Sequence, residues 1–533
     1  MIKKAGSLFV TAYLLLVFGV YPFYMKEGYV DIGEGKYEFF LYCSLGALFI
    51  LALISLFYLG QALHENIRQK RAYLIDWERV SLSATDVLLF MYLALVSLSA
   101  VLSKFRQEAL WGVEGWRMGF VVWAVLCGLY FLVSRLWDAG RVVWSVAILA
   151  SAVVFLLGIT DSFSAYIIPL EIREAGFIST MGNINWFCGY LSVLAPVGIC
   201  FWFFHKPLAK ENKFEKWKAV GLFIYTMIAF MAGLCQGSNS VFLWFGGLFF
   251  VLLWIGVERK AWFRRWFFMV FLWGVSGQII RVLRILCPGK YNYELDNLCG
   301  LFTETNVSLW IAVIALLCYL CMAWMQRKSG SMQKDEEEAV SNHIKTVKRT
   351  RRIQAAILAA VILCWVILSA VNTWTAFSGF LDAGLFLWNE SWGNGRGAAL
   401  KAGFQMFGEM SFVQKLFGVG PDCFASYAYS IDEIAAGLRE YFGASRLTNA
   451  HSEPVTSLVN VGVLGTVSYF GFLISFVVRC FKKGTLKPEF FIPAVCVVSY
   501  LCHNLVSFAQ VLNLPFVMLI VAMGEGMLRR ENE

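Results

Sequence analysis

Long apolar stretches follow one another along nearly the whole chain, separated by short polar segments. A helix needs about 20 predominantly apolar residues to cross the hydrocarbon core of a bilayer. Fourteen stretches approach this length: 7–24, 38–60, 85–103, 118–135, 141–160, 184–204, 217–235, 239–257, 265–283, 306–325, 353–372, 453–478, 489–508 and 511–528. The pattern therefore predicts an all-α protein, a polytopic membrane helical bundle of about 14 transmembrane helices.

The composition agrees with a membrane protein. Of the 533 residues, 59% are hydrophobic and 15% are charged, whereas soluble domains average about 45–50% and roughly 25%. So few charges cannot cover a soluble fold of this length, which excludes a cytosolic enzyme and a disordered chain. The net charge of +9 is read as basic loops at a membrane and not as a phosphate footprint. We expect membrane lipids as partners and no nucleic acid.

Basic residues concentrate in alternate segments between the apolar stretches. If Met1 is cytoplasmic, the inside segments hold most of the 45 Lys and Arg residues. The basic inside loops are 68–79, 206–218, 259–265, 345–352 and 482–487. Because cytoplasmic loops are enriched in Lys and Arg, the pattern predicts a multi-pass protein with both termini in the cytoplasm. The stretch 7–24 follows Lys3 and Lys4 without a cleavage site, as in a signal anchor.

One outside segment, 373–452, is far longer than the others. Loops beyond about 12–15 residues are usually functional or disordered, and this one is rich in aromatic and aliphatic residues. Amphipathic helices are expected at 396–410 and 422–442, with a turn at 418–421. We expect a small helical cap on the outer face. The predicted regions are an N-terminal membrane bundle (1–182), a central membrane bundle (183–372), the large extracytoplasmic loop (373–452) and C-terminal membrane helices (453–533).

Most of the 14 cysteines fall inside apolar stretches, where they act as small apolar residues. Cys287 and Cys299 share one outside loop and could form a disulfide or stay free. No CxxC pair has metal-ligand spacing, so we expect no metal site. Of the five histidines, His451 alone is predicted outside, and His503 is interpreted as a packing group within a span.

Polar and charged side chains that suit phosphate and hydroxyl chemistry gather on the predicted outer face. They are Arg117, Asn183, Asn185, Arg281, Arg284, Arg396, Arg446, His451 and Glu453. Arginine binds phosphate through a planar bidentate fork, and histidine can take a proton from a hydroxyl near neutral pH. This combination suits a lipid-linked pyrophosphate donor and a hydroxyl acceptor.

Each of these features also has a structural interpretation. Interfacial arginines commonly extend to lipid headgroups, and Asn183 and Asn185 could cap the helix that follows them. Gly462 and Gly465 more often allow close helix packing than catalysis. The combination of groups, and not any one of them, favours a site.

Three motifs resemble those of the O-antigen ligase and O-antigen polymerase superfamily of membrane glycosyltransferases. The stretch His451-Ser452, nine residues, then Gly462-Val463-Leu464-Gly465 is similar to the histidine signature of that family. The other two are Gly395-Arg396 with the helix to Gly418-Val419-Gly420-Pro421-Asp422, and Met181-Gly182-Asn183-Ile184-Asn185 at the start of a span. The resemblance covers roughly residues 180–510.

The resemblance implies metal-independent, cofactor-free transfer or polymerisation of glycan in the bacterial cytoplasmic membrane. The donor would be an undecaprenyl-pyrophosphate-linked glycan and the acceptor a glycan or lipid-linked glycan. Arg396 would bind the pyrophosphate, and His451 would act as the base or orient the acceptor hydroxyl. The other gathered residues, Arg117, Arg281, Arg284, Asn183, Asn185, Arg446 and Glu453, would bind substrate.

The chain departs from the family at Asn239, which stands where the family usually has a second arginine. A neutral amide cannot replace that charge. Either Arg281, Arg284 or Arg117 replaces it, or the chain has lost activity.

Two other functions remain open at this point. A lipid or polysaccharide flippase or transporter usually places ionisable groups at mid-membrane. Here almost none is found: His503 is the clearest, and Glu525 lies near the cytoplasmic end of the last apolar stretch. A non-catalytic membrane scaffold would need neither His451 nor Arg396.

Overall fold

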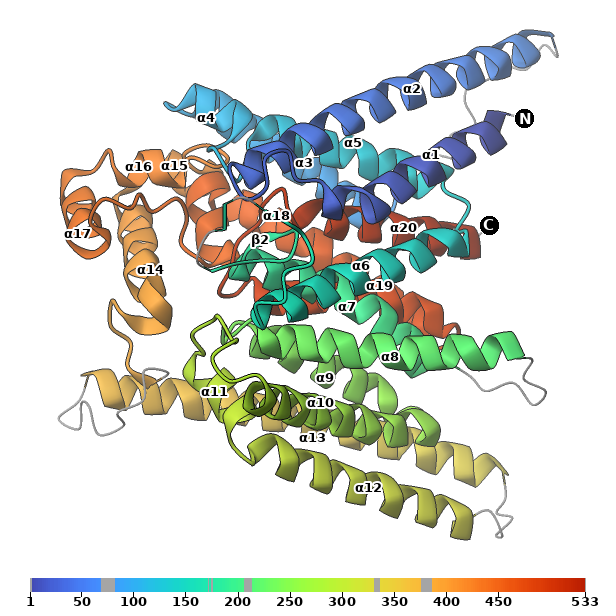
Figure 1. The fold of residues 1–533 in the computed structure, drawn as a ribbon. Coiled ribbons are helices and arrows are strands. Elements are labelled where there is room, and N and C mark those ends of the chain that lie inside the picture. Colours follow the sequence, from blue (N-terminus) through green and yellow to red (C-terminus); the bar gives the residue numbers. More distant parts are fainter. Residues whose placement is uncertain are drawn as a thin grey trace.

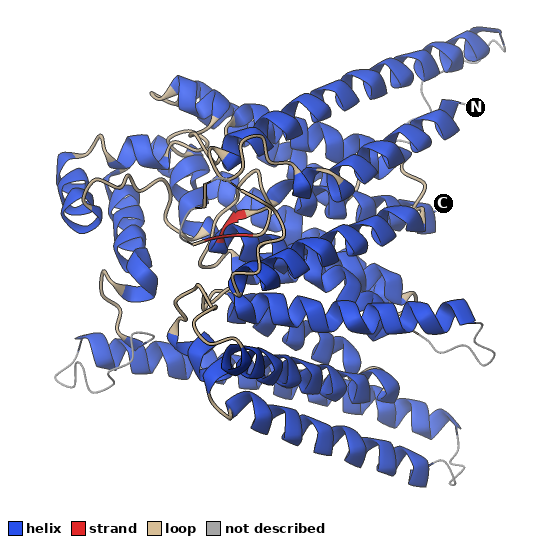
Figure 2. Ribbon diagram, viewed as in Figure 1, coloured by secondary structure: helices blue, strands red, loops and turns tan. Residues whose placement is uncertain are grey.

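The computed structural model describes residues 2–68, 82–170, 172–173, 176–205, 213–329, 336–374 and 386–532. Helices dominate these residues (Figure 2). The first thirteen are α1 (Ile2–Gly19), α2 (Ile32–Arg68), α3 (Ala84–Leu102), α4 (Arg106–Trp111), α5 (Phe120–Leu136), α6 (Arg141–Ser162), α7 (Ile184–Phe204), α8 (Lys213–Cys235), α9 (Val241–Gly256), α10 (Lys260–Leu286), α11 (Asn297–Glu304), α12 (Val307–Ser329) and α13 (Glu336–Trp374).

The second part of the chain adds α14 (Trp392–Glu409), α15 (Phe412–Phe417), α16 (Phe424–Ala428), α17 (Asp432–Phe442), α18 (Glu453–Gly484), α19 (Phe491–His503) and α20 (Leu514–Asn532). Two short 3-10 helices are η1 (Tyr21–Phe23) and η4 (Pro488–Phe490). Strands β1 (Phe177–Ile178) and β2 (Gly182–Asn183) pair antiparallel, with Phe177 opposite Asn183.

Ten helices of the described residues are long and apolar enough to cross a membrane. They are α1 with η1, α2, α3, α6, α7, α8, α10, α12, α13 and α18. Three shorter apolar helices, α5, α9 and α19 with η4, add to them. The predicted all-α, multi-pass membrane protein is thereby confirmed in outline, while the count of fourteen spans stays a prediction.

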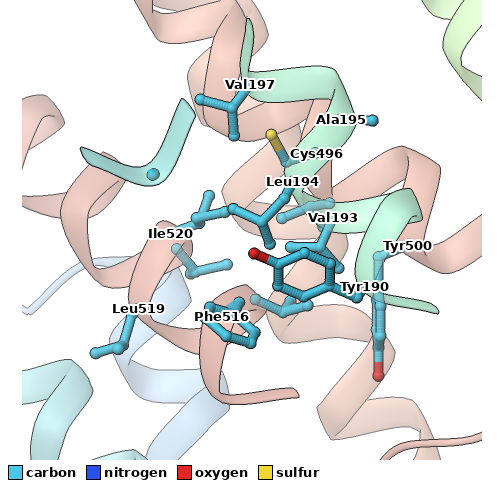
Figure 3. Close-up of a cluster of buried hydrophobic side chains, with 14 of the residues drawn as sticks. Tyr190, Val193, Leu194, Ala195, Val197, Cys496, Tyr500, Phe516, Leu519 and Ile520 are labelled. Atoms are coloured by element: carbon cyan, nitrogen blue, oxygen red, sulfur yellow. The ribbon is translucent and has the colours of Figure 1, made fainter. Parts of the chain in front are cut away.

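Helix α7 forms the centre of the bundle. Its apolar window is 94% buried, against 6% for α13, which lies at the periphery. Tyr190 of α7 packs its ring 5.2 Å from that of Phe516 of α20, and Cys496 and Tyr500 of α19 close the same cluster (Figure 3). Gly198 of α7 lies so close to the Tyr225 ring of α8 that an added Cβ would overlap it, and small residues of this kind let membrane helices pack closely.

The two ends of the bundle differ. Both chain termini lie at one end, and α14, α15, α16 and α17 lie at the other (Figure 1). The prediction of one amphipathic helix over 422–442 was wrong, because α16 ends at Ala428 and α17 begins at Asp432. Asp432 and Glu433 stand in the first turn of α17, where acidic side chains stabilise a helix N-terminus. They favour a new helix over a continued one.

A kink in α18 fixes α15 to the bundle. Gly462 has a φ of +68°, and a Cβ there would overlap the backbone of Leu416 in α15. The backbone N–H groups of Val419 and Gly420 donate to the carbonyls of Val459 and Asn460, each at 3.0 Å. The interpretation of Gly462 as a close-packing residue is confirmed, and the two backbones meet without intervening side chains.

Two predictions from the sequence concern segments that are largely not described and the pairing of two cysteines. The basic loops at 68–79 and 206–218 lie largely outside the described residues, as do residues 375–385 of the predicted cap. All 14 cysteines are free, so Cys287 and Cys299 are not paired in this structure.

Candidate active site at the end of α18

His451 stands two residues before Glu453, the first residue of α18, in a left-handed conformation with a φ of +47°. Its backbone N–H donates to the side-chain oxygen of Asn449 at 2.9 Å. Its ring and the Phe508 ring pack nearly at right angles, with their centroids 5.7 Å apart. Burial, reinforced by the charge of Arg396, lowers the pKa of His451 to about 4. The imidazole is therefore neutral near pH 7 and has a lone pair that can accept a proton.

Arg396 occupies the true start of α14. Gly393, Asn394 and Gly395 all have positive φ values, so regular helix begins at Arg396. Its Nε donates to the Val506 carbonyl at 3.0 Å, one terminal nitrogen donates to the Gly393 carbonyl at 2.7 Å, and the other donates to the Asn185 side-chain oxygen at 3.4 Å. All three acceptors are neutral. Burial lowers the pKa of Arg396, although a guanidinium stays charged in proteins.

Asn183 and Asn185 divide the two roles expected for them. The Asn183 side chain caps α7 by accepting from the Asn185 N–H at 2.8 Å, as the structural interpretation predicted. The side-chain oxygen of Asn185 lies 3.4 Å from a terminal nitrogen of Arg396 and also 3.4 Å from Ser238 Oγ. Asn185 thus joins α7 to α14 and to the turn before α9.

Asn239, where the resemblance expects an arginine, has a structural task. Its side-chain oxygen accepts from the N–H groups of Leu298 at 3.0 Å and Cys299 at 3.2 Å, so it caps α11. Its own N–H donates to Asp296 at 2.8 Å. An arginine has no acceptor atom and cannot cap α11 in this way.

The remaining predicted arginines have partners of their own. Arg117 pairs with Glu34 at 2.9 Å, Arg284 with Glu304 at 2.8 Å and Arg446 with Glu108 at 3.9 Å. Arg281 donates to the side-chain oxygen of Asn306. A phosphate at Arg117 or Arg284 must compete with a carboxylate already in place, whereas in the part of the chain that is described Arg396 has only neutral hydrogen-bond partners.

Glu453, two residues after His451, is the first residue of α18 and is 2% exposed. Its carboxylate accepts from the hydroxyls of Tyr469 at 2.7 Å and Tyr500 at 2.9 Å, and from the Asn504 amide at 2.6 Å. These three donors fix the carboxylate between α18 and α19. The geometry favours a positioning role for Glu453 over direct substrate binding.

The connection 504–513 between α19 and α20 was missed as part of the site, because the sequence pattern assigned it to the ends of two spans. Its Val506 carbonyl holds Arg396, and its Phe508 contacts His451 and, at 4.9 Å, Trp116. The signal available in the sequence was the run of amides within an apolar region. The amides are Asn504, Gln510 and Asn513.

A cavity lies next to the connection between α15 and α16, and its lining includes two residues that contact His451, Asn449 and Phe508. It is lined by Tyr92, Trp116, Met118, Trp123, Pro421, Asp422, Asn449, Glu453, Thr456, Ser457, Asn460, Val461, Phe508 and Ala509. One oxygen of Asp422 accepts from the N–H groups of Val113 at 2.7 Å and Met118 at 3.0 Å. Burial raises the pKa of Asp422 to about 7, against the opposing effect of these two bonds. Asp422 was not predicted as a site residue.

Comparison with known proteins does not assign the chain to a family. No protein-family model matches the chain, and no curated protein matches it. Within the described residues, no group of three or more His, Cys, Asp or Glu side chains is placed to hold a metal ion. The arrangement among the described residues is a guanidinium that hydrogen-bonds to neutral oxygens with the Asp296 carboxylate nearby, a neutral imidazole and a cavity.

Proposed function

We propose that this protein is a membrane glycosyltransferase that transfers or polymerises glycan from an undecaprenyl-pyrophosphate carrier. One observation carries the proposal most: Arg396 hydrogen-bonds only to neutral oxygens among the described residues, and its charge acts on a neutral His451. The Asp296 carboxylate acts on Arg396 through space, and a pyrophosphate would supply the anion that hydrogen-bonds to the guanidinium directly. The three sequence motifs that resemble the O-antigen ligase and polymerase superfamily support the same function.

In the proposed reaction the acceptor hydroxyl oxygen forms a bond to the anomeric carbon of the donor sugar. The bond from that carbon to the phosphate oxygen breaks, and its electron pair leaves with undecaprenyl pyrophosphate. His451 takes the hydroxyl proton. Arg396, at the N-terminus of the regular part of α14, places its own charge and the helix dipole where negative charge grows.

Donor binding would also prepare the base. The charge of Arg396 lowers the pKa of His451, because like charges disfavour each other. A bound pyrophosphate offsets that charge and returns the pKa of His451 toward its ordinary value. The imidazole then becomes a better proton acceptor only after the donor is in place.

The number of spans and their orientation in the membrane are also part of the proposal. The fourteen predicted spans put both termini in the cytoplasm of a bacterial cell and the α14–α17 end at the outer face of the cytoplasmic membrane, where region 373–452 forms a cap. The two termini at one end of the bundle and α14–α17 at the other support it (Figure 1). The lipid-linked donor would then reach Arg396 from the outer leaflet.

Deletion of the gene tests the proposal in cells. We expect a lipid-linked oligosaccharide to accumulate on the outer face of the cytoplasmic membrane while one envelope polymer disappears, and we expect the wild-type gene to restore both. A His451→Ala gene of equal expression should restore neither. An unchanged polymer and an unchanged lipid-linked pool in the deletion strain would contradict the proposal.

A flippase or transporter is the second candidate, and buried charges in the bundle are what favour it. Asp86 and Glu525 are 0% exposed and pair with Arg135 at 3.2 Å and Arg479 at 2.5 Å, respectively. Buried charges in a membrane bundle often mark a transport path, although Asp86 stands in the first turn of α3 and its partner Arg135 in the last turn of α5. A flippase deletion would leave the precursor on the inner face, where glycan-modifying reagents added to intact cells cannot reach it.

A further inference from the structure

We propose that the cavity beside His451 binds a sugar ring of the acceptor, with the Asn460 side-chain oxygen and Asp422 accepting hydrogen bonds from its hydroxyl groups. The inference rests on the proposed function and deepens it. It assigns donor and acceptor to two places that meet at His451.

The position of the cavity suits an acceptor. Two of its lining residues, Asn449 and Phe508, contact His451. Arg396 holds the carbonyl of Val506, two residues before Phe508. A sugar in the cavity and a pyrophosphate at Arg396 would therefore both lie near His451. Its imidazole takes the proton of the acceptor hydroxyl in the proposed reaction.

The charge of the lining excludes the donor pyrophosphate. The lining holds two acidic side chains, Asp422 and Glu453, and none of its residues is basic. An anion there would meet acids in a site of low dielectric. A neutral ligand rich in hydroxyl groups meets no such repulsion.

Asn460 supplies the observation that points to a ligand. It is 8% exposed, and its side-chain oxygen has no hydrogen-bond partner among the described residues. Its backbone carbonyl is already satisfied by Ser99 Oγ at 2.9 Å and the Gly420 N–H at 3.0 Å. Buried polar atoms nearly always have a partner, and an unpaired one is costly. A ligand hydroxyl that donates to Asn460 removes this cost.

Asp422 and the aromatic residues complete the binding surface. The hydrogen bonds that Val113 and Met118 donate to Asp422 both use one carboxylate oxygen, and a carboxylate has acceptor sites on both oxygens. Trp116 and Phe508 meet at nearly right angles, 4.9 Å apart, and Trp123 lines the same cavity. Apolar walls with a few polar groups that fix orientation are the usual pattern of small-molecule sites, and a sugar has both apolar faces and hydroxyl edges.

Asn460→Leu separates a ligand role from a structural one. Leucine has a similar shape, keeps the backbone bonds to Ser99 and Gly420, and removes an unpaired buried oxygen. A purely structural role predicts equal or higher thermal stability and unchanged sugar binding. The proposed role predicts equal or higher stability together with about tenfold weaker sugar binding. Lys401→Ala, which removes an exposed ion pair with Glu390 and alters a residue outside the cavity lining, is the control.

Sugar binding is measured by saturation-transfer NMR on the full-length protein in detergent. The probes are two soluble samples from the producing cells: the oligosaccharide released by mild acid from the lipid-linked pool, and the oligosaccharides released from the mature envelope glycolipids. We expect one of them to bind wild type and Lys401→Ala equally and Asn460→Leu about tenfold more weakly. Absence of binding of both probes to wild type, or equal binding by wild type and Asn460→Leu, would overturn the inference.

Failure of the proposed function would look different. It would appear as unchanged polymer and unchanged lipid-linked pool in the deletion strain, whatever the NMR result. Failure of the acceptor site alone would leave those cellular effects in place, with sugar binding indifferent to Asn460.

Discussion

A terminal nitrogen of Arg396 lies 3.4 Å from the side-chain oxygen of Asn185, although the two residues are 211 positions apart in the chain. This contact joins the start of α14 to the start of α7, the central helix of the bundle. It places a guanidinium with only neutral hydrogen-bond partners, among the described residues, against the most buried part of the protein. Glycan transfer should therefore depend on that placement.

Replacing Arg396 by lysine should impair glycan transfer by about 10²-fold or more. Lysine keeps a positive charge but loses the planar fork, so it cannot hold Val506 and Asn185 and also bind a phosphate. The measurement is release of undecaprenyl pyrophosphate by membranes of equal protein content. Lys401→Ala on the same helix, which removes an exposed ion pair with Glu390, should keep wild-type transfer. Wild-type transfer by Arg396→Lys would show that the fork is not used.

The pH dependence of transfer should reflect His451. Its neutral form is active, so activity falls as pH drops through its pKa, which is about 4 before the donor binds. A bound pyrophosphate raises that pKa, so the acid limb of kcat should lie at higher pH than the acid limb of kcat/KM for the donor. Rate profiles from pH 3 to 8 measure both limbs. Coincident limbs would mean that the donor charge does not act on His451.

Asp422 should make stability depend on pH. Burial raises its folded pKa to about 7, above the ordinary value of an aspartic acid, so its contribution is fully present below the unfolded pKa and is lost as pH rises through about 7. An asparagine in its place would keep an acceptor for Val113 and Met118 without the charge. Relative to wild type, Asp422→Asn should therefore gain apparent Tm at pH 8 compared with pH 5. An equal difference at both pH values would refute the buried-acid assignment.

Asn239→Arg should lower stability and fail to raise transfer. Arginine cannot accept the two N–H bonds that Asn239 receives at α11, and loss of a cap costs about 1 kcal/mol. Asn239→Ala loses the same cap without adding charge, so comparing the two variants isolates the effect of the new guanidinium. Transfer by Asn239→Arg above both wild type and Asn239→Ala would show that the site lacks a second positive charge.

The fold was largely predictable because its main signal is local. Each predicted apolar stretch is occupied by a helix, and the length of such a stretch is set by the bilayer. The division of 422–442 into α16 and α17 was not predicted, because the acidic residues that start α17 compete with an uninterrupted amphipathic pattern.

The site was predictable only where its residues carry motifs. Arg396, Asn185 and His451 were selected from the sequence, and the structure brings them together. The partners of these residues come from distant segments: Val506 and Phe508 lie in the connection 504–513. A period in the sequence reports which face of a helix is apolar, but it does not report which loops meet. Asp422 and Asn460 were missed for the same reason.

The central claim is that Arg396 and His451 transfer glycan from a lipid-linked pyrophosphate. The most direct measurement uses purified full-length protein in liposomes that contain the lipid-linked oligosaccharide extracted from the producing cells. Wild-type protein should release undecaprenyl pyrophosphate and either lengthen the glycan or transfer it to the acceptor. The rate of release by His451→Ala should be lower by roughly 10²–10⁴-fold. Equal release by wild type and His451→Ala, or no release by wild type when both acceptor samples are supplied, would contradict the account.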